Sequence, residues 1–165
     1  SLIDEKKYEC FIANDNSNGQ LVISGRIDHL NKFVDDLKNL RIKNITLPVS
    51  GPFHCELMNK ATIKMEPEIK KLEFNISEKI LISNVTANEM KNPEEIKKLL
   101  IKQIESRVRW RESIIYMIKK GVNHFIEIGP GKVLSGLIKR IDKTVIVDAI
   151  NNEEDINNIK INDKF

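Results

Sequence analysis

The sequence has few of the residues that mark specialised protein classes. Only two of its 165 residues are cysteines, Cys10 and Cys55, and they lie far apart and outside any paired-cysteine motif. This usage fits a reducing compartment and predicts neither a disulfide framework nor a zinc site. No apolar run approaches the length that spans a membrane, and no secretory signal is visible. We therefore expect no membrane partner.

Charge of one sign is not in strong excess either, because 27 basic and 24 acidic residues leave a net charge of +3. Nucleic-acid binding would need basic residues clustered on one face, so we expect no nucleic-acid partner. His29 and His124 have no Cys, Asp or His at metal-ligand spacing. This argues against a metal site.

The order of strands and helices is the first positive signal. With 41% hydrophobic and 31% charged residues, the chain can bury the core of one domain or slightly more. The first elements expected are a strand over 8–13, a loop over 14–19, a strand over 20–25, a helix capped by Asp28 and a strand over 43–49. This order is most of a small α+β unit. Such a unit normally begins with one more strand and helix, which we expect to precede Ser1.

The rest of the chain alternates helices and strands. The elements expected are a helix over 55–72 that Pro67 kinks or divides, a strand over 80–85, helices over 93–104 and 110–120, a strand over 122–128, a helix over 132–141 and a strand over 144–149. The strand over 80–85 is almost continuously apolar, as in a sheet buried on both faces. The alternation predicts an α/β fold with a parallel sheet covered on both faces. The polar tail, 151–165, should form a short helix or fray.

One histidine stands where a general base could be held. An apolar run over 44–49 enters a Gly51-Pro52 corner, and His54 follows just before a helix. Backbone on both sides would aim the side chain, as a general base requires. The alternative is a histidine in an ordinary loop. Cys55 is adjacent, but neighbouring side chains at a helix start point apart, so we do not expect a Cys55–His54 dyad.

A base needs a nucleophile, usually Ser or Cys, and the sequence contains no Gly-x-Ser-x-Gly elbow. The turn Gly129-Pro130-Gly131-Lys132 either binds a phosphate through free amides or is a tight turn that needs glycine. It lacks the spacing of a P-loop or a dinucleotide fingerprint, which favours the tight turn. The default interpretation of the charges that follow is a solvated helix face, formed by Lys132, Lys139 and Arg140.

Several stretches are more specific in combination. They are Leu-Pro-Val-Ser-Gly-Pro-Phe-His-Cys-Glu-Leu-Met at 47–58, Ser-Asn-Val-Thr-Ala at 83–87 and Glu-Ile-Gly-Pro-Gly-Lys-Val-Leu-Ser-Gly-Leu-Ile-Lys-Arg-Ile at 127–141, with 14–25, 102–103 and 108–110. Together they closely resemble the malonyl-CoA:acyl-carrier-protein transacylases of bacterial-type fatty acid synthesis. The matches follow the family order from about residue 8 to residue 150.

The resemblance implies ping-pong acyl transfer without a bound cofactor. In the family, a serine takes malonyl from malonyl-CoA and passes it to the phosphopantetheine thiol of acyl carrier protein. His54 matches the base, and Gln103 matches a glutamine whose backbone carbonyl orients that histidine. Asn16 matches an asparagine beside the substrate cleft. Because acyl carrier proteins are acidic, three basic residues become candidates for docking them: Lys132, Lys139 and Arg140.

The family's serine elbow, its carboxylate-binding arginine and its oxyanion-hole glutamine are absent. The resemblance therefore implies the C-terminal half of the enzyme, with an incomplete ferredoxin-like subdomain over 1–48, part of an α/β-hydrolase-like core over 49–150 and a tail over 151–165. We expect this piece to be inactive without the N-terminal half and to self-associate through an unpaired strand edge. Arg107 and Arg109 replace residues that are often Pro and Gln, which should matter little if they face solvent.

Two other functional classes stay open. One is a non-catalytic scaffold that kept the base-bearing part of an acyltransferase. The other is a polyketide-synthase acyltransferase domain, although residues 51–53 fit the stand-alone malonyl type at least as well. The acyl chain cannot be assigned without the carboxylate-binding arginine. The expected compartment is the cytoplasm in a bacterial-type cell, or an organelle in a eukaryote.

Overall fold

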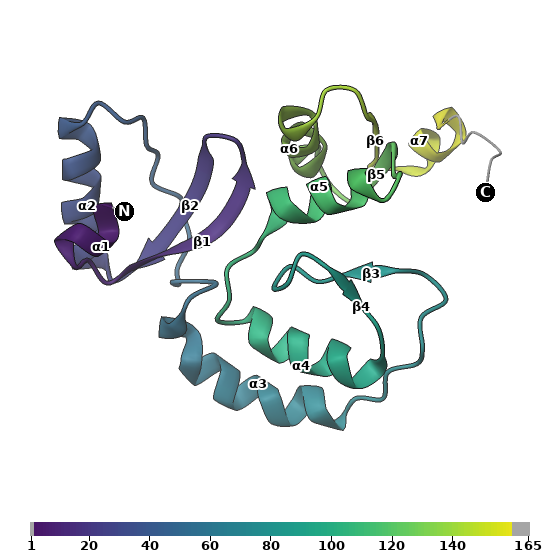
Figure 1. Cartoon of the computed structure of the whole chain (residues 1–165), viewed down its shortest axis with the longest axis horizontal. Helices are drawn as coiled ribbons and strands as arrows, with labels where there is room; N and C mark the ends of the chain where they lie inside the picture. The colour runs from purple at the N-terminus through teal and green to yellow at the C-terminus, as the bar shows by residue number, and fades with distance from the viewer. Residues whose placement is uncertain (1, 160–165) are drawn as a thin grey trace.

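The computed structural model describes residues 2–159, and these form a mixed α/β fold with three separate two-stranded sheets (Figure 1). The helices are α1 (Leu2–Lys6), α2 (Ile27–Asn39), the 3-10 helix η1 (Glu56–Met58), α3 (Asn59–Lys71), α4 (Pro93–Gln103), α5 (Trp110–Lys119), α6 (Val133–Ile141) and α7 (Glu153–Asn158). The strands are β1 (Cys10–Ser17), β2 (Gln20–Gly25), β3 (Leu81–Ile82), β4 (Glu89–Met90), β5 (His124–Ile128) and β6 (Ile146–Ile150). Within residues 2–159, no helix is long and apolar enough to cross a membrane.

The first hairpin, β1 with β2, is tighter than the sequence predicts. A two-residue turn ending at Gly19, whose φ is +76°, replaces the expected loop over 14–19. The polar residues stay in β1 because that strand is held from both sides. It pairs with β2 on one edge, and Asn14 forms a bridge to Val108 on the other. Two register shifts leave Ala13 and Asn16 as bulged residues.

Two predicted strands are wrong. Residues 43–49 form no strand, and Ile45, Leu47 and Val49 are exposed. The run over 80–85 is not a buried strand, because only Leu81–Ile82 pair, with β4, and Ile80 is 71% exposed. A strand needs a partner to satisfy its backbone groups, and in residues 2–159 these apolar runs have little or none.

The helices agree with the sequence predictions better than the strands do. The Asn92 side chain accepts a hydrogen bond from the Glu95 amide at 2.9 Å, with Pro93 opening α4. Gly121, with a φ of +95°, follows the end of α5. One prediction is wrong, because Asp28 does not cap α2 but lies in its first turn, where it pairs with Arg26. Of the two effects expected of Pro67, division of the helix does not occur, because α3 runs unbroken through it.

The main apolar core lies on one face of the parallel pair β5–β6. It consists of Ile114, Phe125, Ile138 and Val145, covered by α5 and α6 (Figure 1). The other face carries Ile126, Ile128 and Ile146, which are 39%, 79% and 48% exposed. The prediction that helices cover both faces is therefore wrong for residues 2–159. One helical layer is present, and the sheet's second apolar face is open.

Replacing Ile114 by Ala should lower the free energy of unfolding by about 3 kcal/mol, because the fully buried side chain would leave a cavity. Urea unfolding followed by circular dichroism measures this. The matched control, Ile126→Ala, removes the same atoms from the open face and should cost less than about 1 kcal/mol. Equal losses would place Ile114 outside the core.

Candidate active site

His54 lies at a corner held from three directions. Its φ is +61°, in the left-handed region, so the chain reverses sharply at this residue. Just before it, the Ser24 hydroxyl of β2 donates to the Phe53 carbonyl at 2.9 Å. Just after it, the thiol of Cys55 donates to the Pro52 carbonyl at 3.1 Å. The corner is thus fixed by β2 and by its own turn.

Gln103 holds His54 from the third direction, and the structure brings these two residues together as the resemblance implies. The Nδ1 atom of His54 lies 3.1 Å from the Gln103 carbonyl oxygen and 3.3 Å from its side-chain Nε2. Nδ1 cannot donate to the first and accept from the second at once. The carbonyl can only accept, whereas the amide has another acceptor in the Ser106 carbonyl at 3.2 Å. We therefore assign the proton to Nδ1, which leaves Nε2 able to accept a proton.

The Gln103 carbonyl suits this task because Gln103 is the last residue of α4. The final carbonyls of a helix have no partner inside the helix and carry the negative end of its dipole. Such a carbonyl orients an imidazole and stabilises its protonated form without a second ionised side chain. The capping signals that start α4 at Asn92 therefore also decide where this acceptor lies.

His54 opens onto a cavity of about 490 Å³, which Cys10, Cys55, Glu105 and Arg107 also line. Neither cysteine fits the role of nucleophile. Burial raises the pKa of the Cys10 thiol, which disfavours its thiolate. Cys55 is 2% exposed and donates its proton to a carbonyl, not to His54. The structure thus agrees with the expectation that Cys55 and His54 form no dyad.

Asn16 lies elsewhere on the hairpin. It is half-buried at the second bulge of β1, and it is not among the residues that line the His54 cavity. The structure therefore does not place Asn16 in the cavity that His54 lines. Its suggested place beside the substrate cleft stays a prediction.

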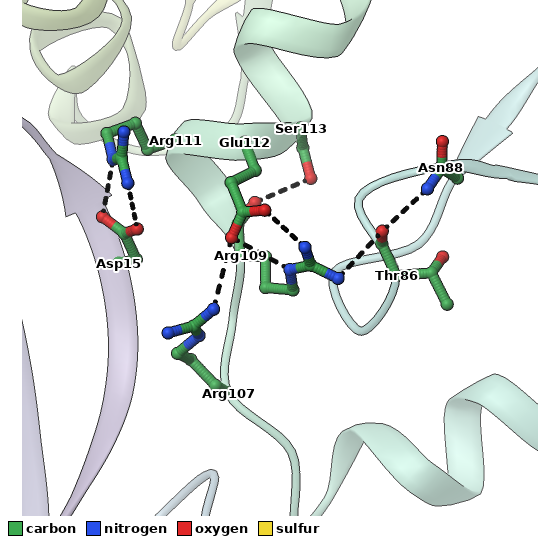
Figure 2. A network of polar contacts seen from close by, with 8 residues as sticks. All are labelled: Asp15, Thr86, Asn88, Arg107, Arg109, Arg111, Glu112 and Ser113. Carbon is green, nitrogen blue, oxygen red and sulfur yellow. Dashed lines mark hydrogen bonds and ion pairs between the residues drawn. The ribbon is translucent and has the colours of Figure 1, made fainter.

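A network of arginines, missed by the sequence analysis, joins the hairpin to α5 (Figure 2). Arg111 donates to both carboxylate oxygens of Asp15, at 2.9 and 2.8 Å, and Asp15 is 6% exposed. Arg109 forms a similar fork with Glu112 and donates to the Thr86 carbonyl at 3.2 Å. The only sequence signal was an acidic residue in a predicted turn.

Arg107 and Arg109 were expected to matter little only if they faced solvent, and both are partly buried. Both contact Glu112, with Arg107 at 3.3 Å. The hydrogen bond from Arg109, and the charges of both arginines, lower the pKa of Glu112 although burial opposes them. A carboxyl whose pKa is lowered on folding adds stability above its ordinary pKa, and this contribution is lost as the pH falls through the lowered value.

The turn before α6 is a structural turn. Gly129 and Gly131 have φ values of +140° and +95°, which only glycine adopts readily. The amides of Leu134 and Ser135, which a phosphate would need, already donate to the Glu127 carboxylate at 3.1 and 2.8 Å. The Ser135 hydroxyl and these amides lower the pKa of Glu127. The tight turn, favoured by the sequence analysis, is confirmed.

The three basic residues near α6 are all exposed. Lys139 donates to the Val145 carbonyl at 2.5 Å, and Arg140 reaches the Gln20 side chain on β2. Lys132 lines a smaller cavity of about 250 Å³ with Asp148 and Asp155. Among residues 2–159, no cluster of His, Cys, Asp and Glu could hold a metal ion.

No protein-family model matches this chain. It is 42% identical over 146 residues to the malonyl CoA-acyl carrier protein transacylase of Bacillus subtilis, covering 88% of this chain and 46% of that protein. A Staphylococcus aureus transacylase of the same name is 40% identical over 152 residues, covering 92% and 49%. The chain is similar to these transacylases. The match spans about half of their length.

Solved structures of transacylases are similar to this chain as well. The crystal structure of the Clostridium perfringens transacylase superposes with a TM-score of 0.88 at 37% identity, covering 95% of this chain and 52% of that one. A malonyl-transacylase in complex with a type II PKS acyl-carrier protein gives 0.86 at 33% identity, covering 92% and 50%. The backbone of this chain is therefore similar to about half of the backbone of each of these transacylases.

Replacing Glu112 by Gln should lower the free energy of unfolding at pH 7 by about 1–2 kcal/mol, since Arg109 and Arg107 lose their charged partner. The difference from the wild type should shrink as the pH falls through the lowered pKa of Glu112. Urea unfolding at several pH values measures both effects. Glu94→Gln is the control, because the Glu94 side chain is 84% exposed. A Glu94 variant with the same losses would assign them to general charge.

Proposed function

We propose that this chain is the base-bearing part of a malonyl-CoA:acyl-carrier-protein S-malonyltransferase of type II fatty acid biosynthesis. The observation that carries the proposal is the hydrogen bond from His54 Nδ1 to the Gln103 carbonyl, which leaves Nε2 free beside a cavity. The similarity to transacylases over half of their length supports it. His54 is the general base, and Gln103 orients it.

The proposed reaction has two halves. His54 Nε2 accepts the hydroxyl proton of a serine as the serine oxygen attacks the malonyl thioester. The resulting imidazolium returns the proton to the CoA thiolate as the carbon–sulfur bond breaks, which leaves malonyl on the serine. In the second half, His54 takes the proton of the phosphopantetheine thiol of acyl carrier protein, and the sulfur attacks the malonyl ester. The imidazolium then returns this proton to the serine oxygen as the ester carbon–oxygen bond breaks, which leaves malonyl on the carrier thiol and restores the serine. No redox or metal step is needed.

The serine must come from outside this chain, because the sequence has no serine elbow. The exposed surface points to a missing partner. A folded protein of 19.0 kDa exposes about 8,400 Å², whereas this chain exposes 12105 Å². The excess, roughly 3,700 Å² on this chain alone, is larger than one partner's half of the about 2,000–5,000 Å² that most obligate interfaces bury in total. A complementary segment with the serine would cover the open face of β5–β6, which a parallel sheet normally buries.

The finer fold and the partners belong to the same proposal. The hairpin and α2 would be part of a ferredoxin-like subdomain over 1–48, and residues 49–150 part of an α/β-hydrolase-like core. Asn16 would reach the substrate cleft once the complementary segment is present. Acyl carrier protein is the proposed partner, since a similar transacylase is seen with such a protein. Its proposed docking residues are Lys132, Lys139 and Arg140.

A scaffold is the second candidate, because the sequence carries a base without a nucleophile. The two candidates differ in one measurement. The part of the Bacillus subtilis transacylase outside the match would be joined to this chain in the order found in that enzyme. Transfer of malonyl from CoA to acyl carrier protein by this chimera supports the enzyme. A folded chimera without transfer supports the scaffold.

In an active chimera, His54→Ala should slow acylation of the serine by roughly two to four orders of magnitude, the usual contribution of a general base. Mass spectrometry of the acyl-enzyme measures the rate. His29→Ala is the control, because the His29 ring accepts from the Glu9 amide at 2.7 Å and does not line the His54 cavity. A nearly normal rate for His54→Ala would remove His54 from the mechanism.

Gln103→Ala separates the two contacts that Gln103 makes with His54. The backbone carbonyl survives this change and the side-chain amide does not. If the carbonyl orients the imidazole, acylation should slow by less than about tenfold. A loss as large as that of His54→Ala would show that the side-chain amide holds the ring, and would reverse the tautomer that we assign.

A further inference from the structure

The backbone at His54 is strained. Its φ of +61° lies in the left-handed region, where a side chain crowds the following carbonyl. Gly51, three residues earlier, would tolerate a positive φ but does not adopt one. A strained conformation of this kind persists only where the surrounding contacts hold it. The contacts around the turn must therefore place the reversal of the chain at His54.

Two buried side chains hold the carbonyls just before the strained residue. The hydroxyl of Ser24 donates to the Phe53 carbonyl at 2.9 Å. The thiol of Cys55 donates to the Pro52 carbonyl at 3.1 Å. Ser24 is 8% exposed and Cys55 is 2% exposed, so neither donor would meet bulk water if the turn relaxed. Because a buried donor without a partner is costly, both bonds oppose rotation of the peptides ahead of the turn.

The Cys55 side chain serves this turn and not the helix that follows. Cys55 is the N-cap residue of η1, where a side chain normally accepts a hydrogen bond from an amide of the first turn. Its side chain makes no such capping bond, and the thiol donates backward to Pro52. The helix begins through main-chain atoms, since the Met58 amide donates to the Cys55 carbonyl at 3.0 Å.

A third contact near the base contributes less. Asn59, at the start of α3, donates to the Glu105 carboxylate at 3.1 Å, which also connects this region with the end of α4. That bond is exposed, so water competes for both of its groups. The two buried bonds therefore resist movement of the turn more strongly than the exposed one.

We propose that Ser24 and Cys55 are positioning residues for His54. By holding the two carbonyls, they keep the left-handed turn, and the turn keeps the Nδ1 atom of His54 against the Gln103 carbonyl. This gives β2 a part in the site, although none of its residues, all of which the structure describes, lines the His54 cavity. The role of His54 as a base rests on the proposed function, whereas the hold on its ring does not.

The tautomer of the His54 ring, read by heteronuclear NMR of its two nitrogens, tests the proposal in the full chain. A wild type whose Nδ1 donates to the Gln103 carbonyl should populate mainly the Nδ1–H tautomer. Ser24→Ala and Cys55→Ala should each shift the tautomer ratio toward Nε2–H by roughly two- to tenfold, the equilibrium effect of one lost hydrogen bond. Ser24→Thr and Cys55→Ser keep a donor and should restore the wild-type ratio.

Ser113→Ala is the matched control. The buried Ser113 hydroxyl donates to the Arg109 carbonyl at 2.9 Å, which is the same kind of bond outside the His54 cavity (Figure 2). This variant should leave the tautomer ratio unchanged, and a shift as large as that of Ser24→Ala would overturn the proposal. Folded Ser24→Ala and Cys55→Ala chains with the wild-type ratio would overturn it too.

Two further outcomes are decisive. A wild type that holds its proton on Nε2 would overturn the proposal, because the His54 ring would then not donate to Gln103. If an alanine variant does not fold, Ser24→Cys keeps the size of the side chain and weakens the donor, so it should give a smaller shift in the same direction. An unchanged ratio there would also overturn the proposal. The expected shifts without malonyl transfer by the chimera would count against the proposed function alone.

Discussion

The rest of the structure depends on a crossing of the chain at Val108, where the segment before α5 passes alongside β1 and the loop over 83–88. The Val108 amide donates to the Ala13 carbonyl at 2.8 Å, and the Asp15 amide donates to the Val108 carbonyl at 2.9 Å. One residue later, the Arg109 amide donates to the Asn84 carbonyl at 2.9 Å. A short extended segment thereby joins the hairpin, the loop over 83–88 and α5. These parts share no continuous sheet, so this crossing and the packing around it set their relative positions.

Ion pairs on both sides secure the crossing. A buried carboxylate such as Asp15 is costly to desolvate, and the cost is offset only where geometry is good and the lone pairs are used. The fork with Arg111 and the Asp15 amide bond to Val108 meet that condition. Glu112 does the same for Arg109 at the start of α5 (Figure 2). The crossing follows closely after Gln103 in the chain. Its position therefore also affects where the Gln103 carbonyl, the acceptor for His54, lies.

Much of the chain was predictable where the signal is local. Asn92 and Pro93 predict the start of α4, and Gly121 predicts the end of α5. These signals work because a capping residue forms its hydrogen bonds within a single turn of the chain. The strand over 43–49 failed for the opposite reason. Its apolar alternation is real, but a strand exists only when another backbone pairs with it, and none does so within residues 2–159. The open face of β5–β6 shows the same dependence, on a second layer that residues 2–159 do not supply.

The sequence by itself determined the start of α4, the end of α5, the glycine turn before α6 and, through the resemblance, the pairing of His54 with Gln103. Each depends on residues within one turn or on a motif that can be compared directly. Only the tertiary structure decided that Asp15 is a buried partner of Arg111, which lies 96 residues away in the chain. It also brought the Gln103 carbonyl to within 3.1 Å of His54 Nδ1, because a helix end and a left-handed corner had to come together. Contacts across such separations depend on how elements pack, and no local pattern records that packing.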